Sequence, residues 1–87
     1  MTYSIQIEAS AAKDLARITS PYRERIIAAI DALAMHPHGG SQLKGDLRGL
    51  RRIRVGNYRV VYELLDKELL ILVIRVSHRR EVYRRRS

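Results

Sequence analysis

The chain has 87 residues, a net charge of +8 and no cysteine, which allows one small domain, residues 1–87, with a thin core. The lack of cysteine excludes disulfide bonds and thiolate metal sites and indicates a reducing compartment, the cytoplasm. The longest strongly apolar run, Leu69–Ile74, is far shorter than the ~20 residues of a membrane span, and residues 1–4 show no signal-peptide pattern, so we expect no membrane attachment.

The N-terminal half predicts one strand followed by two helices. Residues 3–8 alternate between apolar and polar side chains, which is the period of a half-buried strand. Residues 9–18 are rich in alanine and predict a short helix. Ser20 and Pro21 predict the N-cap and the first residue of a second helix, which continues at helical spacing to Met35. Because the connection is short, the two helices should form an antiparallel hairpin.

The C-terminal half predicts a loop over residues 41–49 and then three strands. These strands are Leu50–Val55, Tyr58–Leu65 and Leu69–Ser77. The order β-α-α-β-β-β is typical of an α+β fold. We therefore expect an antiparallel sheet of about four strands, with the N-terminal helix hairpin packed on one face.

The turn between the first two of these strands fixes their register. Residues 56–57, Gly-Asn, predict a two-residue type II′ turn. That register places Arg54 opposite Arg59 and Arg52 opposite Val61, all on one face of the sheet. The apolar side chains of the hairpin share the other face, which we assign to the core: Ile53, Val55, Tyr58, Val60, Tyr62 and Leu64.

The next turn decides the face on which Arg75 lies. A three-residue turn over 66–68 places Arg75 beside Arg59 on the open face. A two-residue turn would bury the guanidinium, which its desolvation cost disfavours. We predict the three-residue turn, which also assigns four residues to the core face: Leu70, Leu72, Ile74 and Val76.

Positive charge is concentrated in the C-terminal half. Residues 1–43 hold four basic and four acidic side chains, whereas residues 44–87 hold 13 basic and five acidic ones. Most of the excess is arginine, which binds phosphate in a planar, bidentate way. Arg54 opposite Arg59 is a like-charge pair that destabilises the sheet by itself. This pattern indicates a surface for a polyanion, foremost nucleic acid, although a generic solubilising surface would also be basic.

Three blocks of sequence resemble the RelE family of bacterial and archaeal toxins. They are residues 43–45 (Leu-Lys-Gly), residues 50–62 (LRRIRVGNYRVVY) and residues 76–84 (VSHRREVYR). The order of elements along the whole chain also matches. The Tyr-Arg-Val-Val-Tyr strand is common to the wider RelE/ParE superfamily and indicates the fold, whereas the C-terminal block is more specific to the RNA-cleaving branch.

The resemblance implies a toxin of a type II toxin–antitoxin system that cleaves mRNA on the ribosome and thereby inhibits translation. The 2′-hydroxyl would attack the adjacent phosphate and leave a 2′,3′-cyclic phosphate, with no metal or cofactor. The implied catalytic residues are Arg52, Arg54, Arg59, Arg79 and Tyr83, the last as a base-stacking ring. The further RNA-binding candidates are Lys44, Arg75, His78 and Arg80, of which Arg80 is the alternative to Arg79 in the alignment.

The proton acceptor is the open point of this mechanism. Relatives that carry lysine at positions 52 and 54 have a possible base there, but arginine does not deprotonate in proteins. The remaining candidates are Tyr83, His78 and ribosomal RNA acting with water.

Two other functions fit parts of the pattern. A ParE-like inhibitor of DNA gyrase shares the fold without nuclease chemistry, and a non-catalytic nucleic-acid-binding module shares the charge. For the toxin, the expected partners are mRNA in the ribosomal A site, ribosomal RNA and an acidic, RelB-like antitoxin. We expect the toxin alone to be monomeric and its antitoxin complex to be a hetero-oligomer.

Overall fold

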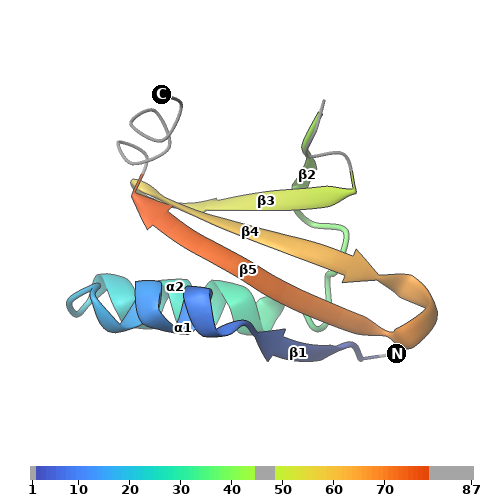
Figure 1. Cartoon of the computed structure of the whole chain (residues 1–87), viewed down its shortest axis with the longest axis horizontal. Helices are drawn as coiled ribbons and strands as arrows, with labels where there is room; N and C mark the ends of the chain where they lie inside the picture. The colour runs from blue at the N-terminus through green and yellow to red at the C-terminus, as the bar shows by residue number, and fades with distance from the viewer. Residues whose placement is uncertain (1, 45–48, 79–87) are drawn as a thin grey trace.

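The computed structural model describes residues 2–44 and 49–78, which form two helices and a five-stranded sheet (Figure 1). The elements follow in the order β1 (Ser4–Ile7), α1 (Ala9–Ala16), α2 (Tyr22–Ala32), β2 (Ser41–Gln42), β3 (Leu50–Val55), β4 (Tyr58–Leu65), the 3₁₀ turn η2 (Asp66–Glu68) and β5 (Leu70–His78). Neither helix of these residues is long and apolar enough to cross a membrane.

The sheet has the strand order β1-β5-β4-β3-β2 and is covered by the two helices on one face (Figure 1). The predicted α+β class and one-sided helix packing are confirmed. The sheet has five strands rather than four, because residues 41–42 pair with β3 inside the predicted loop. It is also mixed rather than antiparallel, since β1 lies parallel to β5 at one edge.

The second helix begins and ends differently from its prediction. Pro21 occupies the N-cap position, and Ser20 makes no cap to the backbone. Instead, the Ser20 hydroxyl donates a hydrogen bond to the Glu24 carboxylate at 2.8 Å, which lowers the pKa of Glu24 below its ordinary value. The helix ends at Ala32, and turns carry the chain through Met35.

The β3–β4 hairpin has the predicted register. Val55 pairs with Tyr58, and only the first turn residue, Gly56, has a positive φ, as a type II′ turn requires. Arg54 lies opposite Arg59. The six side chains assigned to the core face are all buried or packed against the core: Ile53, Val55, Tyr58, Val60, Tyr62 and Leu64.

The prediction for β5 is wrong in part. The pair Leu65–Leu70 closes a four-residue connection, so the strand starts on the opposite face from the one predicted. Ile71 and Val73, rather than their neighbours, are therefore fully buried. A β-bulge opposite the step from Val61 to Tyr62 then adds one residue, Ile74, and reverses the alternation. After the bulge Val76 faces the core and Arg75 the open face, as predicted.

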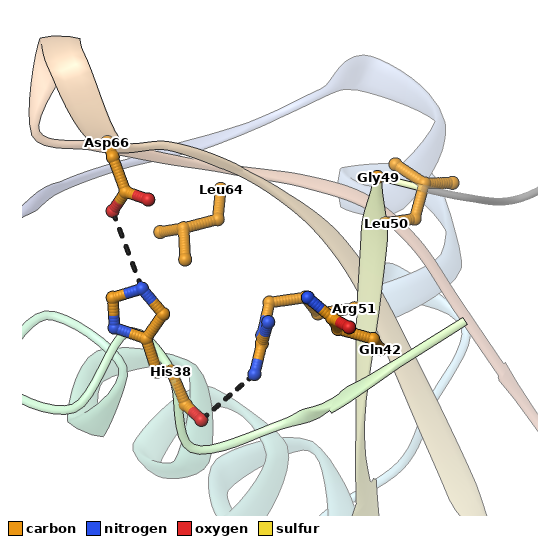
Figure 2. A pocket seen from close by; sticks show the side chains of 7 residues that line it. All are labelled: His38, Gln42, Gly49, Leu50, Arg51, Leu64 and Asp66. Atoms are coloured by element: carbon orange, nitrogen blue, oxygen red, sulfur yellow. Dashed lines mark hydrogen bonds and ion pairs between the residues drawn. The ribbon is translucent and has the colours of Figure 1, made fainter. Parts of the chain in front are cut away.

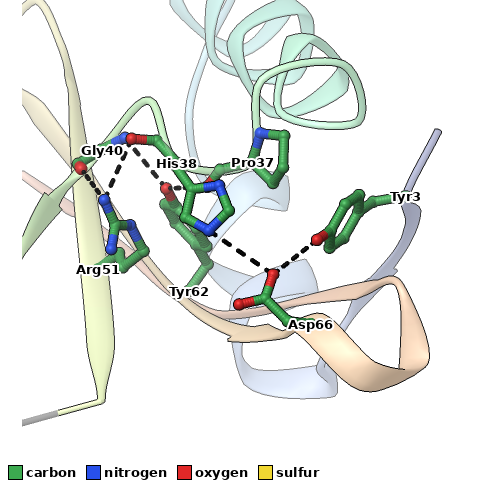
Figure 3. A network of polar contacts seen from close by, with 7 residues as sticks. All are labelled: Tyr3, Pro37, His38, Gly40, Arg51, Tyr62 and Asp66. Carbon is green, nitrogen blue, oxygen red and sulfur yellow. Dashed lines mark hydrogen bonds and ion pairs between the residues drawn. The ribbon is translucent and has the colours of Figure 1, made fainter. Parts of the chain in front are cut away.

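The core lies between the helices and the covered face of the sheet. Its buried side chains are Ala11, Leu15, Ile18, Ile26, Ile30, Leu33, Val60, Tyr62, Ile71, Val73 and Val76. Tyr62 also has a polar function. Its hydroxyl accepts the Gly40 N–H at 3.1 Å and donates to the Pro37 carbonyl at 3.0 Å, and so ties the loop after α2 to the sheet (Figure 3).

A surface network links β1, η2 and the same loop (Figure 3). The Tyr3 hydroxyl donates to Asp66 Oδ1 at 2.6 Å, and His38 Nε2 lies 3.6 Å from the same oxygen. The hydrogen bond to Asp66 raises the pKa of Tyr3 above its ordinary value of 10.0, with desolvation and the carboxylate charge adding to it.

This raised pKa gives a testable pH dependence. Because folding favours the protonated phenol, the contact should stabilise the fold fully below pH 10.0 and lose this effect as the pH rises through the raised value. We expect the Tyr3 ring carbon to titrate above pH 10.0 by NMR, with Tyr3→Phe assigning the signal. Asp66→Ala should return the titration toward the ordinary value, and an unshifted titration in the unmodified protein would contradict the assignment.

Candidate functional site

The face of the sheet opposite the two helices, which we call the open face, carries a set of arginines next to the β3–β4 turn. Two rows cross three strands there. Arg54, Arg59 and Ser77 form the row nearer the turn, and Arg52, Val61 and Arg75 form the second row. Neighbouring strands lie about 4.8 Å apart, and residues two positions apart on a strand lie about 6.6 Å apart. The four arginines therefore start from neighbouring backbone positions on one face of the sheet. We call Arg52, Arg54, Arg59 and Arg75 the arginine array.

Three members of the array form no ion pair with an acidic side chain that the structure describes. Within residues 2–44 and 49–78, no carboxylate forms an ion pair with Arg52, Arg54 or Arg75. Arg54 is exposed, whereas Arg52 and Arg75 are half-buried. Arg54 lies directly opposite another arginine, and these three guanidinium groups have no carboxylate partner among the described residues, so each can pair with an external anion.

Ser77 is a site neighbour that sequence reasoning did not single out. It lies opposite Arg59 on the open face, yet it is only 3% exposed. The predicted alternation of β5 already placed it on the arginine side. Ser77 therefore forms a buried end of the first row, beside Arg59.

Arg51 differs from its neighbour Arg52, although both stand in one run of basic residues. Arg51 points to the helix-covered face, where its Nη2 donates to the carbonyls of Gly40 at 2.7 Å and His38 at 3.1 Å (Figures 2 and 3). It holds the loop after α2 against β3. Because successive side chains of a strand point to opposite faces, Arg51 has a structural role, whereas Arg52 belongs to the arginine array.

His78 does not join the array. It pairs with Tyr58 across β4 and β5 and so lies on the helix-covered face. The two rings pack edge to face, with centroids 5.2 Å apart and planes at 86°. Tyr22 extends this group, since its ring centroid lies 6.1 Å from that of Tyr58. His78 therefore lies on the opposite face of the sheet from the array, and its RNA-binding role and its role as a base stay predictions.

The remaining predicted residues fall away from the array or outside the structure. Lys44 is exposed and follows β2 near the start of β3, at the opposite end of that strand from Arg54. Its RNA-binding role stays a prediction. Arg79, Arg80 and Tyr83 lie outside the described residues.

A small hollow of about 180 Å³ opens at the other end of the hairpin (Figure 2). Its lining residues are His38, Gln42, Gly49, Leu50, Arg51, Leu64 and Asp66. Among the residues the structure describes, no group of three histidine, cysteine or acidic side chains could hold a metal ion.

The fold and the array together define a small α+β protein with four arginines on one face of its sheet. Residues 5–83 match the family model of the ParE toxin of the type II toxin–antitoxin system. Toxin RelE of Mycobacterium tuberculosis is 38% identical over 94% of this chain and 87% of its own length. Toxin RelG of the same organism is 30% identical over 98% of this chain and 100% of its own length.

The fold has a close structural counterpart. The toxin–antitoxin complex RelBE2 of M. tuberculosis contains a chain that superposes with a TM-score of 0.84 at 24% identity, over 90% of this chain and 99% of that one. The chain thus belongs to the RelE/ParE superfamily and is a RelE-type toxin of the type II toxin–antitoxin class.

Proposed function

We propose that this toxin is an mRNA endoribonuclease that acts in the cytoplasm. It would cleave mRNA in the A site of the ribosome and so inhibit translation. The observation that carries the proposal is the arginine array, because four guanidinium groups on one open face suit a dianionic, phosphorane-like transition state. Toxin RelE of M. tuberculosis, at 38% identity, supports the RelE-type activity. Arg79, Arg80 and Tyr83 would complete the site from the C-terminal segment, with Tyr83 stacking on a base.

The chemistry needs orientation and charge neutralisation more than a dedicated protein base. The 2′-hydroxyl attacks the adjacent phosphorus while the bond to the 5′-oxygen of the next nucleotide breaks. The products are a 2′,3′-cyclic phosphate and a 5′-hydroxyl. Arg54 and Arg59 would hold the non-bridging oxygens, and Arg52 and Arg75 would add charge from the second row. Since arginine does not accept the proton, Tyr83 or ribosomal RNA with water is the proposed acceptor.

The test is cleavage of mRNA on purified ribosomes with a defined codon in the A site, followed by primer extension. We expect cleavage within that codon, ends that carry a cyclic phosphate and a 5′-hydroxyl, and no comparable cleavage of the same mRNA without ribosomes. Intact mRNA at a stoichiometric excess of toxin would contradict the proposal.

A gyrase inhibitor is the second candidate, and the match to the ParE family model favours it. The arginine array speaks against it, because binding a protein target does not need four arginines gathered on one open face. Supercoiling assays with purified gyrase separate the two functions. We expect supercoiling to be unaffected at toxin concentrations that cleave ribosome-bound mRNA. A non-catalytic nucleic-acid-binding module would instead bind free RNA in a salt-sensitive way and cleave nothing.

The proposed inhibitor is an acidic antitoxin that covers the array or displaces the C-terminal segment. The M. tuberculosis RelBE2 structure is itself a toxin–antitoxin complex, which supports such a partner here. Acidic side chains would neutralise Arg52, Arg54 and Arg75, which have no carboxylate partner among the described residues. A cognate complex that left both surfaces exposed would contradict this model.

A further inference from the structure

The orientation of Arg75 depends on the β-bulge in β5. Before the bulge, Ile71 and Val73 face the core, and strict alternation would turn Arg75 toward the same side. The extra residue, Ile74, reverses the alternation, so that Arg75 pairs with Val61 on the open face. Whatever holds the bulge therefore controls one of the four members of the arginine array.

Two side chains of α1 bond the backbone of β5 at this point. β1 ends its pairing at Val73, and beyond it the same side of β5 faces α1. The Ser10 hydroxyl donates to the Ile74 carbonyl at 2.9 Å, and the Val76 N–H donates to Asp14 Oδ2 at 2.9 Å. Ser10 and Asp14 are four residues apart and so lie above each other on one face of the helix.

These two bonds hold the two peptide planes on either side of Arg75. The Ile74 carbonyl belongs to the planar peptide that precedes Arg75, and the Val76 N–H belongs to the one that follows it. The φ and ψ angles of Arg75 are the rotations between those planes. When both planes are fixed, the direction in which the Arg75 side chain leaves the strand is fixed too. The helix is itself anchored, because Ala11 and Leu15 are buried beside the two polar residues.

We propose that Ser10 and Asp14 are positioning residues for Arg75, which hold its guanidinium on the phosphate-binding face without touching RNA. The proposal rests on the proposed nuclease function and adds to the site a pair of residues from the opposite side of the sheet. Asp14 is half-buried and its bond is partly shielded from water, so it should act more strongly than the exposed Ser10.

The first test is a double-mutant cycle in the ribosome cleavage assay. Asp14→Ala and Arg75→Ala should each slow single-turnover cleavage about tenfold, since misplacement by ~1 Å can cost up to about 100-fold. If Asp14 acts through Arg75, the double variant should be no slower than Arg75→Ala alone. A double variant whose rate falls by the product of the two single effects would overturn the proposal. Asp14→Asn keeps an acceptor oxygen and should retain most activity, and Lys13→Ala, at an exposed neighbour, serves as the matched control.

The second test is made on the free protein and does not depend on cleavage. In Asp14→Ala, NMR should show faster exchange of the Val76 amide proton and a changed coupling constant for the ψ angle of Arg75, the rotation of the peptide plane that Asp14 holds. Asp14→Asn should show neither change. An unchanged Arg75 coupling would overturn the positioning role even if cleavage fell. If the unmodified protein did not cleave mRNA on ribosomes, the proposed function would be wrong, but the effect of Asp14 on the Arg75 backbone would still be decided by these NMR measurements. Should Asp14→Ala fail to fold, Ser10→Ala tests the peptide plane that precedes Arg75, through slower cleavage and a changed coupling constant for the φ angle of Arg75, with smaller effects.

Discussion

Replacing Arg54 by alanine is expected to slow mRNA cleavage on the ribosome by about 100- to 1000-fold, the usual cost of removing one donor that stabilises transition-state charge. Arg54 is the exposed member of the first row and lies directly opposite Arg59. A phosphate bound between them would lose half of its bidentate contacts. Binding of the toxin to ribosomes should remain measurable, because the rest of the array is intact.

The stability of Arg54→Ala distinguishes a loss of catalysis from a loss of the fold. The Arg54–Arg59 pair is repulsive, and a like-charge cross-strand pair costs about 0.2–1 kcal/mol. Arg54→Ala should therefore unfold at the same temperature or higher while its cleavage is lost, as expected of a site that is strained for function. The measurements are single-turnover cleavage and thermal unfolding of the same preparation.

Two further variants sharpen the comparison. Arg54→Lys keeps the charge but not the planar fork, so it should cleave at an intermediate rate. Arg17→Ala removes an exposed arginine at the C-cap of α1 and should leave cleavage unchanged. Undiminished cleavage by Arg54→Ala would refute the assignment of Arg54 to the site.

The β3–β4 hairpin could be predicted in full because all its information is local. A two-residue turn at Gly56 sets the register, and the two-residue period of a strand then assigns every side chain to a face. That period also separates Arg51, which holds a loop, from Arg52, which faces outward. The positions of the three array arginines on this hairpin, Arg52, Arg54 and Arg59, therefore follow directly from the sequence.

The course of β5 could not be predicted because it depends on distant residues. The connection after Leu65 contains four residues and ends at Leu69 in the left-handed region, with φ 52°. The bulge at Ile74 is held by side chains more than 60 positions earlier in the chain. The wrong turn length and the missed bulge offset each other, which is why Arg75 was placed on the correct face for an incomplete reason.

The two edge strands were also beyond local reasoning. β2 contains only two residues, too few for any alternation to be recognised, and it forms because the loop before it is tied down by Tyr62 and Arg51. The parallel pairing of β1 with β5 joins residues 66 positions apart, such as Ser4 and Leu70. Sequence periodicity identifies such a strand but does not choose its partner.

Replacing Gly40 by alanine is expected to destabilise the fold by about 2–4 kcal/mol, from overpacking strain and the loss of a part-buried hydrogen bond. A Cβ atom there would lie 2.6 Å from the Arg52 carbonyl oxygen and 2.7 Å from the Tyr62 hydroxyl. The first contact is with backbone, so β3 itself must shift. The second disturbs the hydroxyl that bonds both Pro37 and Gly40.

The site should register this change as well, because the displaced carbonyl belongs to the strand that carries Arg52 and Arg54. The midpoint temperature of thermal unfolding should fall by about 4–8 °C for each kcal/mol lost in a domain of this size. The rate of mRNA cleavage by the folded fraction should also fall. Gly39→Ala is the matched control. Its added Cβ atom would lie 3.1 Å from the His36 carbonyl oxygen and would not meet β3. Equal stability of the two variants would show that Gly40 is not needed for the close approach of the loop to β3.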